Sequence, residues 1–285
     1  MPSDLTGKAC LVTGGSAGIG LATACRLACM GAAVTILGRD RMRGEAAAAK
    51  IGKAAGRDAA VFVPVDLSDF SQVRSFAAKL LSRLPRLDIL VANAGALMGA
   101  RQVSVDGIEM TFALNHLSPF LLVHQLLPAL RAAAPARVVV VASEAHRGAT
   151  LDFDDLQAEL RYDRWRQYKR SKLANIMFTY QLARRLPDRA HGVTVNALHP
   201  GFVATDIGVR HGFVPRLFWS LGKLAAVSPE RGAATSIYLA SAEEVAGTTG
   251  QYFVDCKPAR SSAASYDEEA SQRLWDISAN LTGAA

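Results

Sequence analysis

The sequence contains little cysteine, and its few cysteines suggest neither a metal site nor a disulfide framework. Four of the 285 residues are cysteine. Cys25 and Cys29 lie one helical turn apart without histidine or cysteine partners at ligand spacing, so we interpret the pair as core packing. Such usage suits a reducing environment. It predicts a cytoplasmic location and no metal site.

Long apolar runs are also missing. No stretch of about 18 or more apolar residues occurs, so the sequence predicts no transmembrane segment. The opening residues, MPSDLTGKACLVTGG, lack a basic region followed by a long apolar core, which predicts no signal peptide.

Charge of one sign is not concentrated anywhere. The formal net charge is +7, but Lys and Arg are scattered along the chain. The densest basic run, residues 161–170, contains an acid, and we interpret it as a solvated face. The sequence therefore predicts no nucleic-acid partner, although a basic surface would help to attract an anionic cofactor.

What is present is an alternation of short apolar runs with Ala/Leu-rich helical patterns, in a chain that is 50% hydrophobic and 20% charged. We expect strands, buried on both faces of a parallel sheet, at Ala9–Thr13, Ala33–Leu37, Ala60–Val65, Asp88–Ala92, Val138–Ala142 and Val193–Leu198. We expect helices at Ile19–Met30, Met42–Ala55, Phe70–Leu84, Asp106–Leu130 and Tyr168–Leu186. The pattern predicts one α/β domain with a doubly wound parallel sheet of about seven strands and helices on both faces.

A glycine-rich segment, Thr13-Gly-Gly-Ser-Ala-Gly-Ile-Gly20, joins the first strand to the first helix. Its glycines allow a tight turn and a close approach to a pyrophosphate, and the helix N-terminus supplies N–H donors. The alternative is a tight turn without a ligand. At this junction we favour a dinucleotide site, which uses Gly14, Ser16, Gly18, Ile19 and Gly20.

The end of the second strand discriminates between NAD and NADP. Gly38 stands where an acid would bind the adenosine ribose, and Arg39 follows it. An arginine can pair with a 2′-phosphate through its planar fork, so the sequence predicts that NADP(H) is preferred over NAD(H). Asp40 would repel a phosphate if it pointed inward, and we expect it to cap the following helix instead.

Polar residues also follow the third and fourth strands. Asp66-Leu67 and Asn93-Ala94-Gly95 are expected at the carboxyl edge of the sheet, where open α/β sheets bind ligands. Ordinary polar turns are the alternative. Their common placement favours contact with the cofactor.

Tyr168 and Lys172 are four residues apart on a helical pattern and so share a face. A phenol has a pKa of about 10, and a nearby ammonium lowers it, as a proton donor to a carbonyl requires. A surface pair is the alternative. Ser143, expected at the end of the fifth strand, could polarise a substrate carbonyl. Asn115 disfavours the helix in which it stands, so we assign it a packing or functional role.

These residues occur in the order typical of the short-chain dehydrogenase/reductase family, which the chain resembles over nearly its whole length: Thr13-Gly-x-x-x-Gly-Ile-Gly20, Asn93-Ala94-Gly95, Asn115, Ser143, Tyr168-x-x-x-Lys172 and Pro200-Gly201. The resemblance implies a single-domain Rossmann fold and a Ser-Tyr-Lys-Asn tetrad. It further implies that Lys172 holds the nicotinamide ribose, that Asn115 supports a relay water, and that Pro200, Gly201, Val203 and Thr205 contact the cofactor. Enzymes of this fold usually pair through the helices that carry Asn115 and Tyr168, so a homodimer is compatible with the sequence.

Further blocks resemble the retinol dehydrogenase and WW-domain oxidoreductase branch: Gly38-Arg39-Asp40 with Gly44-Glu45, Asn115-His116-Leu117, Ala142-Ser143-Glu144-Ala145-His146, Ser171-Lys172-Leu173-Ala174-Asn175, His199-Pro200-Gly201, Ser228-Pro-Glu-Arg-Gly-Ala233 and Gly250-Gln-Tyr-Phe-Val-Asp-Cys256. The branch implies NADP and lipophilic aldehydes, ketones or alcohols. The chain departs from it in lacking an N-terminal hydrophobic anchor and in having Ser118-Pro119 where a Gly-His pair is usual. Secondary-metabolite ketoreductases and protochlorophyllide reductases are similar alternatives.

The segment 202–227 is rich in aromatic and aliphatic residues and follows the sixth strand. We expect it to form a lid over the nicotinamide, which predicts a lipophilic substrate. Plain core packing and contact with a membrane surface are the alternatives, the latter the weaker. His146 and Trp165 are further candidates for the border of the pocket, and a structural role is the alternative for each.

We treat residues 1–285 as one domain: 1–142 mainly bind the cofactor, 143–258 carry the catalytic and substrate half, and 259–285 form a polar tail with a short helix around Asp267–Ser278. The sequence predicts an NADP(H)-dependent carbonyl/alcohol oxidoreductase. A catalytically silent nucleotide-binding regulatory module is the alternative from another class, and the presence of Tyr168, Lys172 and the glycines argues against it.

Overall fold

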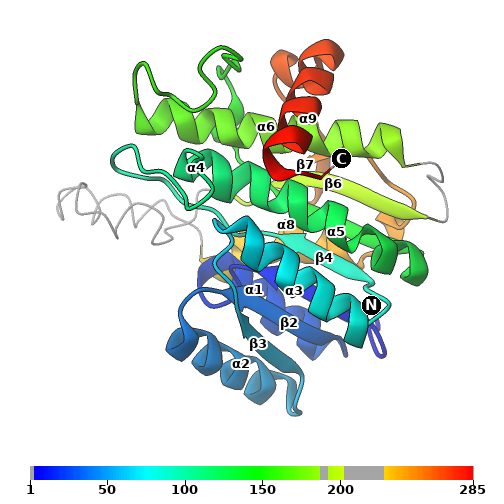
Figure 1. The fold of residues 1–285 in the computed structure, drawn as a ribbon. Coiled ribbons are helices and arrows are strands. Elements are labelled where there is room, and N and C mark those ends of the chain that lie inside the picture. Colours follow the sequence, from blue (N-terminus) through cyan, green and yellow to red (C-terminus); the bar gives the residue numbers. More distant parts are fainter. Residues whose placement is uncertain (1–2, 187–191, 202–227, 285) are drawn as a thin grey trace.

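A computed structural model describes residues 3–186, 192–201 and 228–284 of the chain (Figure 1). Within these residues one sheet runs in the order β3-β2-β1-β4-β5-β6-β7-β8. Its strands are β1 (Ala9–Thr13), β2 (Ala33–Gly38), β3 (Ala60–Pro64), β4 (Ile89–Ala92), β5 (Ala136–Val141), β6 (Val193–His199), β7 (Tyr252–Val254) and β8 (Lys257–Ala259). All neighbours pair in parallel except β7 and β8. The strand order reverses between β1 and β4, and such a switch point is where open α/β sheets bind ligands.

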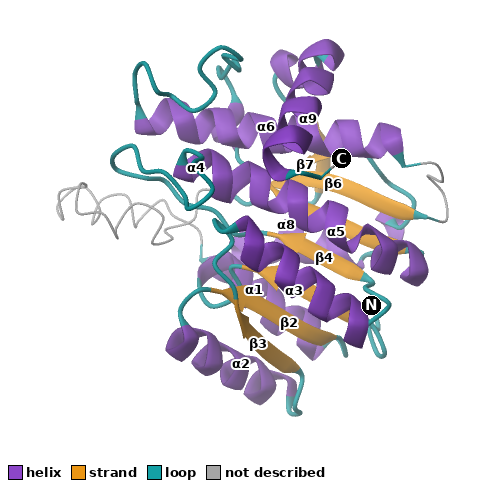
Figure 2. Cartoon of the chain, in the orientation of Figure 1, coloured by secondary structure: helices purple, strands orange, loops and turns teal. Residues whose placement is uncertain are grey.

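Helices cover both faces of the sheet, as Figure 2 shows. The helices are α1 (Gly18–Cys29), α2 (Arg41–Ala55), α3 (Phe70–Arg83), α4 (Met110–Phe112), α5 (Ser118–Ala133), α6 (Arg164–Arg185), α8 (Pro229–Ser241) and α9 (Glu268–Thr282). Side chains of β1 alternate between two buried cores, because successive residues of a strand point to opposite faces. Leu11 packs with α3, α5 and α6, whereas Val12 packs with α1, α2 and α8. The doubly wound α/β sheet is thus confirmed.

Two local predictions were wrong. The strand β3 is not buried on both faces: it forms an edge of the sheet, and Val61 is 61% exposed. Cys29 is exposed, and its thiol donates to Ala54 O, so only Cys25 of that pair is partly packed. The sheet also gains the short antiparallel strand β8, which has too few apolar residues to stand out in the sequence.

The helix expected at Asp106–Leu130 begins four residues later and is not regular. Its N-terminus is capped by the buried carboxylate of Glu109, which accepts hydrogen bonds from Thr111 N and Phe112 N, both at 2.8 Å. Between α4 and α5 the chain makes a π-helical turn, η1 (Ala113–Leu117). Such turns often mark functional positions, because the wider turn redirects side chains. This one carries Asn115.

The C-terminal segment, predicted as a polar tail with a short helix around Asp267–Ser278, forms the longer helix α9, which crosses α6 (Figure 1). Trp275 of α9 packs against Phe120 and His124 of α5 and Phe178 of α6. Ser278 donates to Leu274 O, so its hydroxyl oxygen accepts from His116 Nε2 at 2.9 Å. The helix is therefore anchored to η1 and to both long helices.

The fully buried imidazole of His116 makes stability depend on acid. Burial lowers the pKa of His116 to about 4, so between that value and its ordinary 6.5 the unfolded chain binds a proton that the folded chain does not. Stability is therefore complete above pH 6.5 and is lost as the pH falls towards 4. The variant His116→Gln keeps a donor for Ser278 but does not titrate. Between pH 7 and pH 5 we expect its free energy of unfolding to fall by about 2 kcal/mol less than that of the wild type.

Urea unfolding at both pH values checks this prediction, with His124→Gln, at a less buried imidazole, as the comparison. Equal acid sensitivity of the wild type and His116→Gln would contradict it.

Candidate active site

The glycine loop after β1 is built for a close approach of another molecule. Gly14 and Gly18 have φ angles of +65° and +53°. A Cβ on Gly20 would lie 2.4 Å from Gly14 O and 2.5 Å from Asn93 Nδ2, so only glycine fits there. The helix α1 begins at Gly18, and its N-cap, Ala17, offers no side-chain acceptor to the first N–H groups. These donors fit a dinucleotide pyrophosphate.

Asn93 joins the ends of β1 and β4. Its side-chain amide donates to Thr13 O at 2.9 Å, and Thr13 Oγ1 accepts from the backbone N–H of Asn93 and Ala94, both at 2.9 Å. Two strand ends at the switch point are thus held in register. Through these contacts with Thr13, Asn93 helps to shape the glycine cradle, the loop of residues 13–20 after β1.

The end of β2 lies beside the glycine loop. A Cβ on Gly38 would lie 3.5 Å from Ser16 Oγ, so the glycine loop and the end of β2 face each other. Arg39 is exposed. Asp40 caps α2 by accepting from Arg43 N at 3.0 Å, and it pairs with the Arg43 guanidinium at 3.1 Å, as the sequence predicted for a capping role.

Asp66 and Leu67 follow β3 at the same edge of the sheet. One carboxylate oxygen of Asp66 accepts from the backbone N–H and the hydroxyl of Ser68, at 2.9 and 2.6 Å. Leu67 is buried in the core. Asp66 thus organises the turn and lies half-buried beside it.

Lys172 lies in the centre of α6 and is 4% exposed. Its ammonium donates to Val141 O, at the end of β5, at 3.0 Å. Burial lowers the pKa of Lys172 to about 8. An ammonium has three donors, and within the described residues this bond uses one, so the others are available to a ligand.

Tyr168 precedes Lys172 by one turn, and the Lys172 ammonium lies 5.6 Å from the centre of its ring. The sequence predicted a lowered pKa for the Tyr168 phenol, but burial raises it, and only hydrogen bonding with the Ser143 side chain opposes the rise. Ser143 stands two residues after the end of β5, and its Oγ accepts from Ala145 N at 3.1 Å. The serine proton therefore stays free for donation. The predicted trio of Ser143, Tyr168 and Lys172 is brought together at the carboxyl edge of the sheet.

Asn115 completes the cluster from η1 and is fully buried. Its side chain accepts from Ala96 N at 2.8 Å and donates to Ala96 O at 2.9 Å. It also donates to Ser171 Oγ at 3.0 Å, and Ser171 in turn donates to Tyr168 O at 2.7 Å. Asn115 thus fixes the loop after β4 and the helix turn of Tyr168.

Gly95 lies between these groups. A Cβ there would come within 3.2 Å of Asn115 Oδ1 and 3.4 Å of Lys172 Nζ. The loop after β4 therefore lies beside the catalytic candidates. It lies between the glycine cradle on one side and the Lys172 ammonium and Tyr168 phenol on the other.

Pro200 and Gly201 follow β6 at the same edge, with Gly201 at φ +81°. The predicted contacts of Val203 and Thr205 and the lid at 202–227 lie outside the described residues. Trp165 is 52% exposed and stands edge-on to the Tyr168 ring, with 6.3 Å between the ring centres. It borders the phenol.

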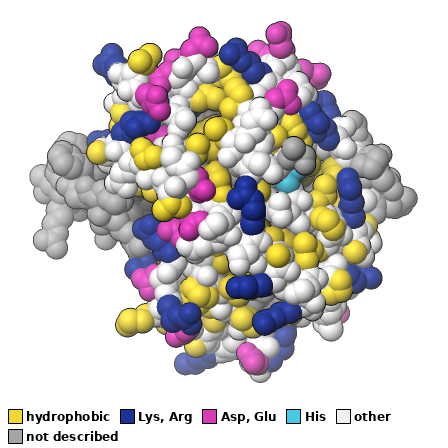
Figure 3. All heavy atoms as spheres, in the orientation of Figure 1, with side chains coloured by type: hydrophobic (Ala, Val, Ile, Leu, Met, Phe, Trp, Pro, Cys, Tyr) yellow, Lys and Arg dark blue, Asp and Glu magenta, His cyan; other side chains and the backbone are white. Residues whose placement is uncertain are grey.

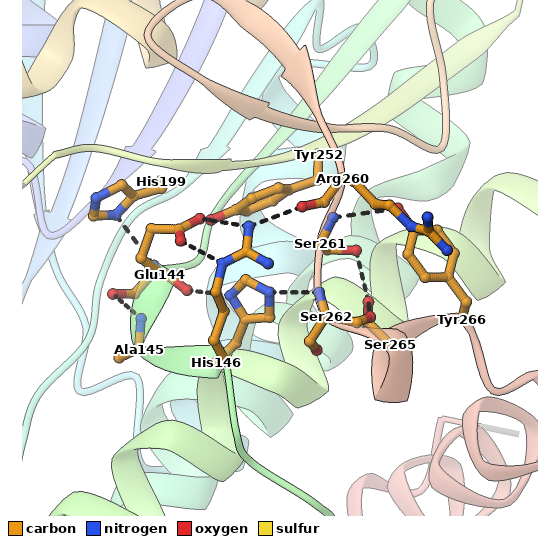
Figure 4. Close-up of polar contacts among 12 residues, drawn as sticks. Glu144, Ala145, His146, His199, Tyr252, Arg260, Ser261, Ser262, Ser265 and Tyr266 are labelled. Carbon is orange, nitrogen blue, oxygen red and sulfur yellow. Dashed lines mark hydrogen bonds and ion pairs between the residues drawn. The ribbon is translucent and has the colours of Figure 1, made fainter.

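A polar network surrounds the turn after Ser143 (Figure 4). Of its members, the sequence had indicated only His146 as a candidate. His146 is buried and holds the Ser143 main chain, and His199 Nδ1 accepts from Glu144 N at 3.2 Å. Glu144 accepts from Arg147 Nε at 2.5 Å and from the Tyr252 hydroxyl at 2.8 Å. The block Ser-Glu-Ala-His directly after a strand is the signal that could have identified this network.

Other features of the described residues limit the kinds of site. Among residues 3–186, 192–201 and 228–284, no three His, Cys, Asp or Glu side chains form a group that could hold a metal ion. In the same ranges no helix has the length and apolar character needed to cross a membrane. On the face seen in Figure 3, basic and acidic side chains are interspersed.

Comparisons with known proteins agree with this geometry. The family model described as short chain dehydrogenase matches residues 8–211. Human retinol dehydrogenase 14 is 41% identical, with 99% of this chain and 88% of that protein covered. Human retinol dehydrogenase 12 is 41% identical, with 98% and 88% covered.

Among solved structures, an uncharacterised protein from Mycobacterium paratuberculosis is similar with a TM-score of 0.81 at 30% identity, covering 99% of this chain and 96% of that one. The Pseudomonas aeruginosa RhlG/NADP active-site complex has a TM-score of 0.71 at 32% identity, covering 89% and 96%. The chain therefore belongs to the short-chain dehydrogenase family of oxidoreductases.

Proposed function

We propose that the protein is an NADP(H)-dependent oxidoreductase that interconverts a lipophilic aldehyde or ketone and its alcohol. The observation that carries the proposal is the convergence of Ser143, Tyr168 and Lys172 beside a glycine cradle. A nicotinamide cofactor, held by the glycine loop of residues 13–20 and by Lys172, would supply or accept the hydride. The side chains supply the proton and the binding geometry.

In the reductive direction, the hydroxyl of Ser143 donates a hydrogen bond to the substrate carbonyl oxygen and polarises it. Tyr168, whose phenol stays protonated at neutral pH, transfers its proton to that oxygen. The Lys172 ammonium favours the phenolate that remains, and its other donors bind the ribose hydroxyls. Asn115 holds the Ala96 main chain and the Ser171 hydroxyl on either side of these groups.

The lipophilic substrate class is supported by three observations. Trp165 presents an exposed aromatic ring beside the phenol. The sequence of 202–227 is strongly apolar. Relatives at about 40% identity bear the name retinol dehydrogenase. Oxidation of NADPH by a panel of long-chain aldehydes, retinal, aromatic ketones and quinones tests the class. Turnover restricted to short polar carbonyls would contradict it.

The preference for NADP is supported by Gly38 and Arg39 at the end of β2, and by a solved relative with NADP at its active site. Asp40 is engaged by Arg43, so its charge is balanced where a phosphate would lie.

We expect Arg39→Ala to weaken NADPH binding about tenfold to a hundredfold, and NADH binding hardly at all, because only NADPH carries the 2′-phosphate. Fluorescence titration with both cofactors measures this. Arg41→Ala is the matched control, since that neighbouring arginine pairs with Glu45 at 3.3 Å. Equal losses for NADPH and NADH would move the phosphate contact elsewhere.

A cytoplasmic location and a homodimer stay predictions. The pairing expected through α5 and α6 would use helices that α9 already contacts through Trp275. Size-exclusion chromatography with light scattering tests the dimer directly.

A further inference from the structure

His146 contributes no atom to the surface of the protein, yet both of its ring nitrogens are hydrogen-bonded to backbone groups (Figure 4). It ends the short helical turn η2 (Glu144–His146), which follows Ser143 directly. Nδ1 lies 2.6 Å from Ser143 O, and Nε2 lies 3.0 Å from Ser262 N. One ring thus spans the candidate catalytic serine and the segment after β8.

These partners determine the tautomer. A backbone N–H can only donate, so Nε2 accepts from Ser262 and carries no proton. A carbonyl oxygen can only accept, so Nδ1 carries the proton and donates it to Ser143 O. His146 is therefore a neutral ring with one fixed direction of donation.

The far end of this connection is firmly held. Ser261, next to Ser262, exchanges hydrogen bonds with the Tyr180 hydroxyl of α6 at 2.7 Å and with Ser265 at 2.6 Å. Its backbone N–H donates to the Tyr266 hydroxyl at 3.2 Å. The segment is thus fixed to the helix that carries Tyr168 and Lys172.

A second connection runs beside the first. Arg147 bonds the Glu144 carboxylate and donates to Arg260 O at 2.8 Å. The Tyr252 ring stands edge-on to His146 at 5.2 Å between ring centres, while its hydroxyl donates to Glu144. The backbone from Ser143 to Arg147 is therefore clamped against β7 and the segment after β8.

We propose that His146 is a positioning residue for the reaction proposed above, on which this inference rests. By holding the carbonyl of Ser143, its Nδ1–H fixes the main chain from which the serine hydroxyl points towards Tyr168. Ser143 Oγ already accepts from Ala145 N, so its direction depends on this turn keeping its shape. A serine displaced by a fraction of an ångström would polarise the carbonyl poorly while substrate still binds.

Two substitutions separate the two nitrogens of the ring. In His146→Asn the side-chain amide can donate from the position of Nδ1 and so keep the bond to Ser143 O, but it does not reach Ser262. In His146→Gln the side chain can accept at the position of Nε2 and keep Ser262, but it offers nothing at the position of Nδ1. Both lose the ring and its packing on Tyr252, so each controls for the other.

We expect His146→Asn to retain kcat within about threefold, and His146→Gln to lower kcat about tenfold to a hundredfold with KM and NADPH affinity nearly unchanged. Hydrogen exchange of residues 143–147, measured without substrate, should rise in the Gln variant more than in the Asn variant. Thermal unfolding of both variants records the structural cost.

Equal losses of kcat in both variants, in proportion to their loss of thermal stability, would overturn the proposal and leave His146 a packing residue. Equal exchange of residues 143–147 in both variants would overturn it independently of turnover. If the wild type reduces no carbonyl in the panel but exchange separates the variants as expected, the positioning by His146 stands and the proposed function fails.

Discussion

Tyr168→Phe is expected to lower turnover about a hundredfold to ten-thousandfold while leaving NADPH affinity nearly unchanged. The substitution removes one hydroxyl from a half-buried ring and keeps its shape. That hydroxyl is the proton source in our mechanism, and its neighbours, Ser143 and Lys172, have their own anchors at Ala145 N and Val141 O. The loss should therefore fall on kcat.

The pKa values in the site decide which groups carry a proton at neutral pH. Burial keeps the pKa of Tyr168 above its ordinary value, so the proton is present at neutral pH. Lys172, with a pKa of about 8, is mostly charged there and lies 5.6 Å from the ring centre. A charged neighbour favours the phenolate formed by donation.

Tyr238→Phe is the control, because Tyr238 belongs to α8 on the opposite face of the sheet. Steady-state rates measure the turnover of both variants, and fluorescence titration measures their affinity for NADPH. Undiminished turnover in Tyr168→Phe would refute the acid role of this phenol.

Lys172→Met is expected to have the second large effect. It should lower activity and raise stability. Turnover should fall about a hundredfold or more, and NADPH affinity about tenfold, because the ammonium serves both the phenol and the ribose in our mechanism. At the same time methionine replaces a buried charge with an apolar chain of similar length. The variant should therefore be more stable than the wild type near pH 7.

The direction of this change in stability follows from the pKa of Lys172. The folded-state pKa of Lys172 is lowered to about 8 from 10.5, so between these values the unfolded chain binds more protons, and wild-type stability rises with pH. Below pH 8 the cost of the buried charge is fully present. Lost hydrogen bonding to Val141 O offsets part of the gain, so we expect a net advantage of about 2 kcal/mol for Lys172→Met at pH 7 that shrinks towards pH 10.

Urea unfolding at several pH values measures this advantage. Lys169→Met, at an exposed position near the start of the same helix, should change neither activity nor the pH dependence of stability. A Lys172→Met variant that is less stable than the wild type at pH 7, or that turns over normally, would contradict the assignment.

The sequence predicted those parts of the molecule that depend on local pattern. Runs such as Cys10–Val12 are apolar on both faces because they lie in the middle of a sheet, and the glycines at 14, 18 and 20 stand at a strand-to-helix junction. Residues at strand ends, such as Ser143 and Asn93, follow from this framework, because parallel strands all end at one edge.

What the sequence did not predict depends on contacts between distant residues. The position of β3 at the edge of the sheet follows from the strand order, which the local sequence does not reveal. The exposed Val61 has the same apolar side chain as a valine in a buried strand. The sequence predicted a helix at the position of α9 but not its packing, in which Trp275 and Ser278 contact residues over 150 positions away. The π-helical turn η1 likewise depends on the hydrogen bonds of Asn115 to Ala96 and Ser171. The anchoring of His146 to Ser262, 116 residues apart, belongs to the same class.

Transfer of deuterium tests the central claim most directly. The protein is incubated with a carbonyl compound that the panel above identifies as a substrate and with NADPH that carries deuterium at both positions of nicotinamide C4, and the alcohol product is analysed by mass spectrometry. We predict an alcohol with one deuterium on the former carbonyl carbon, formed by the wild type and nearly absent with Tyr168→Phe. An alcohol without the label, or equal formation of the labelled alcohol by both proteins, would contradict hydride transfer assisted by Tyr168.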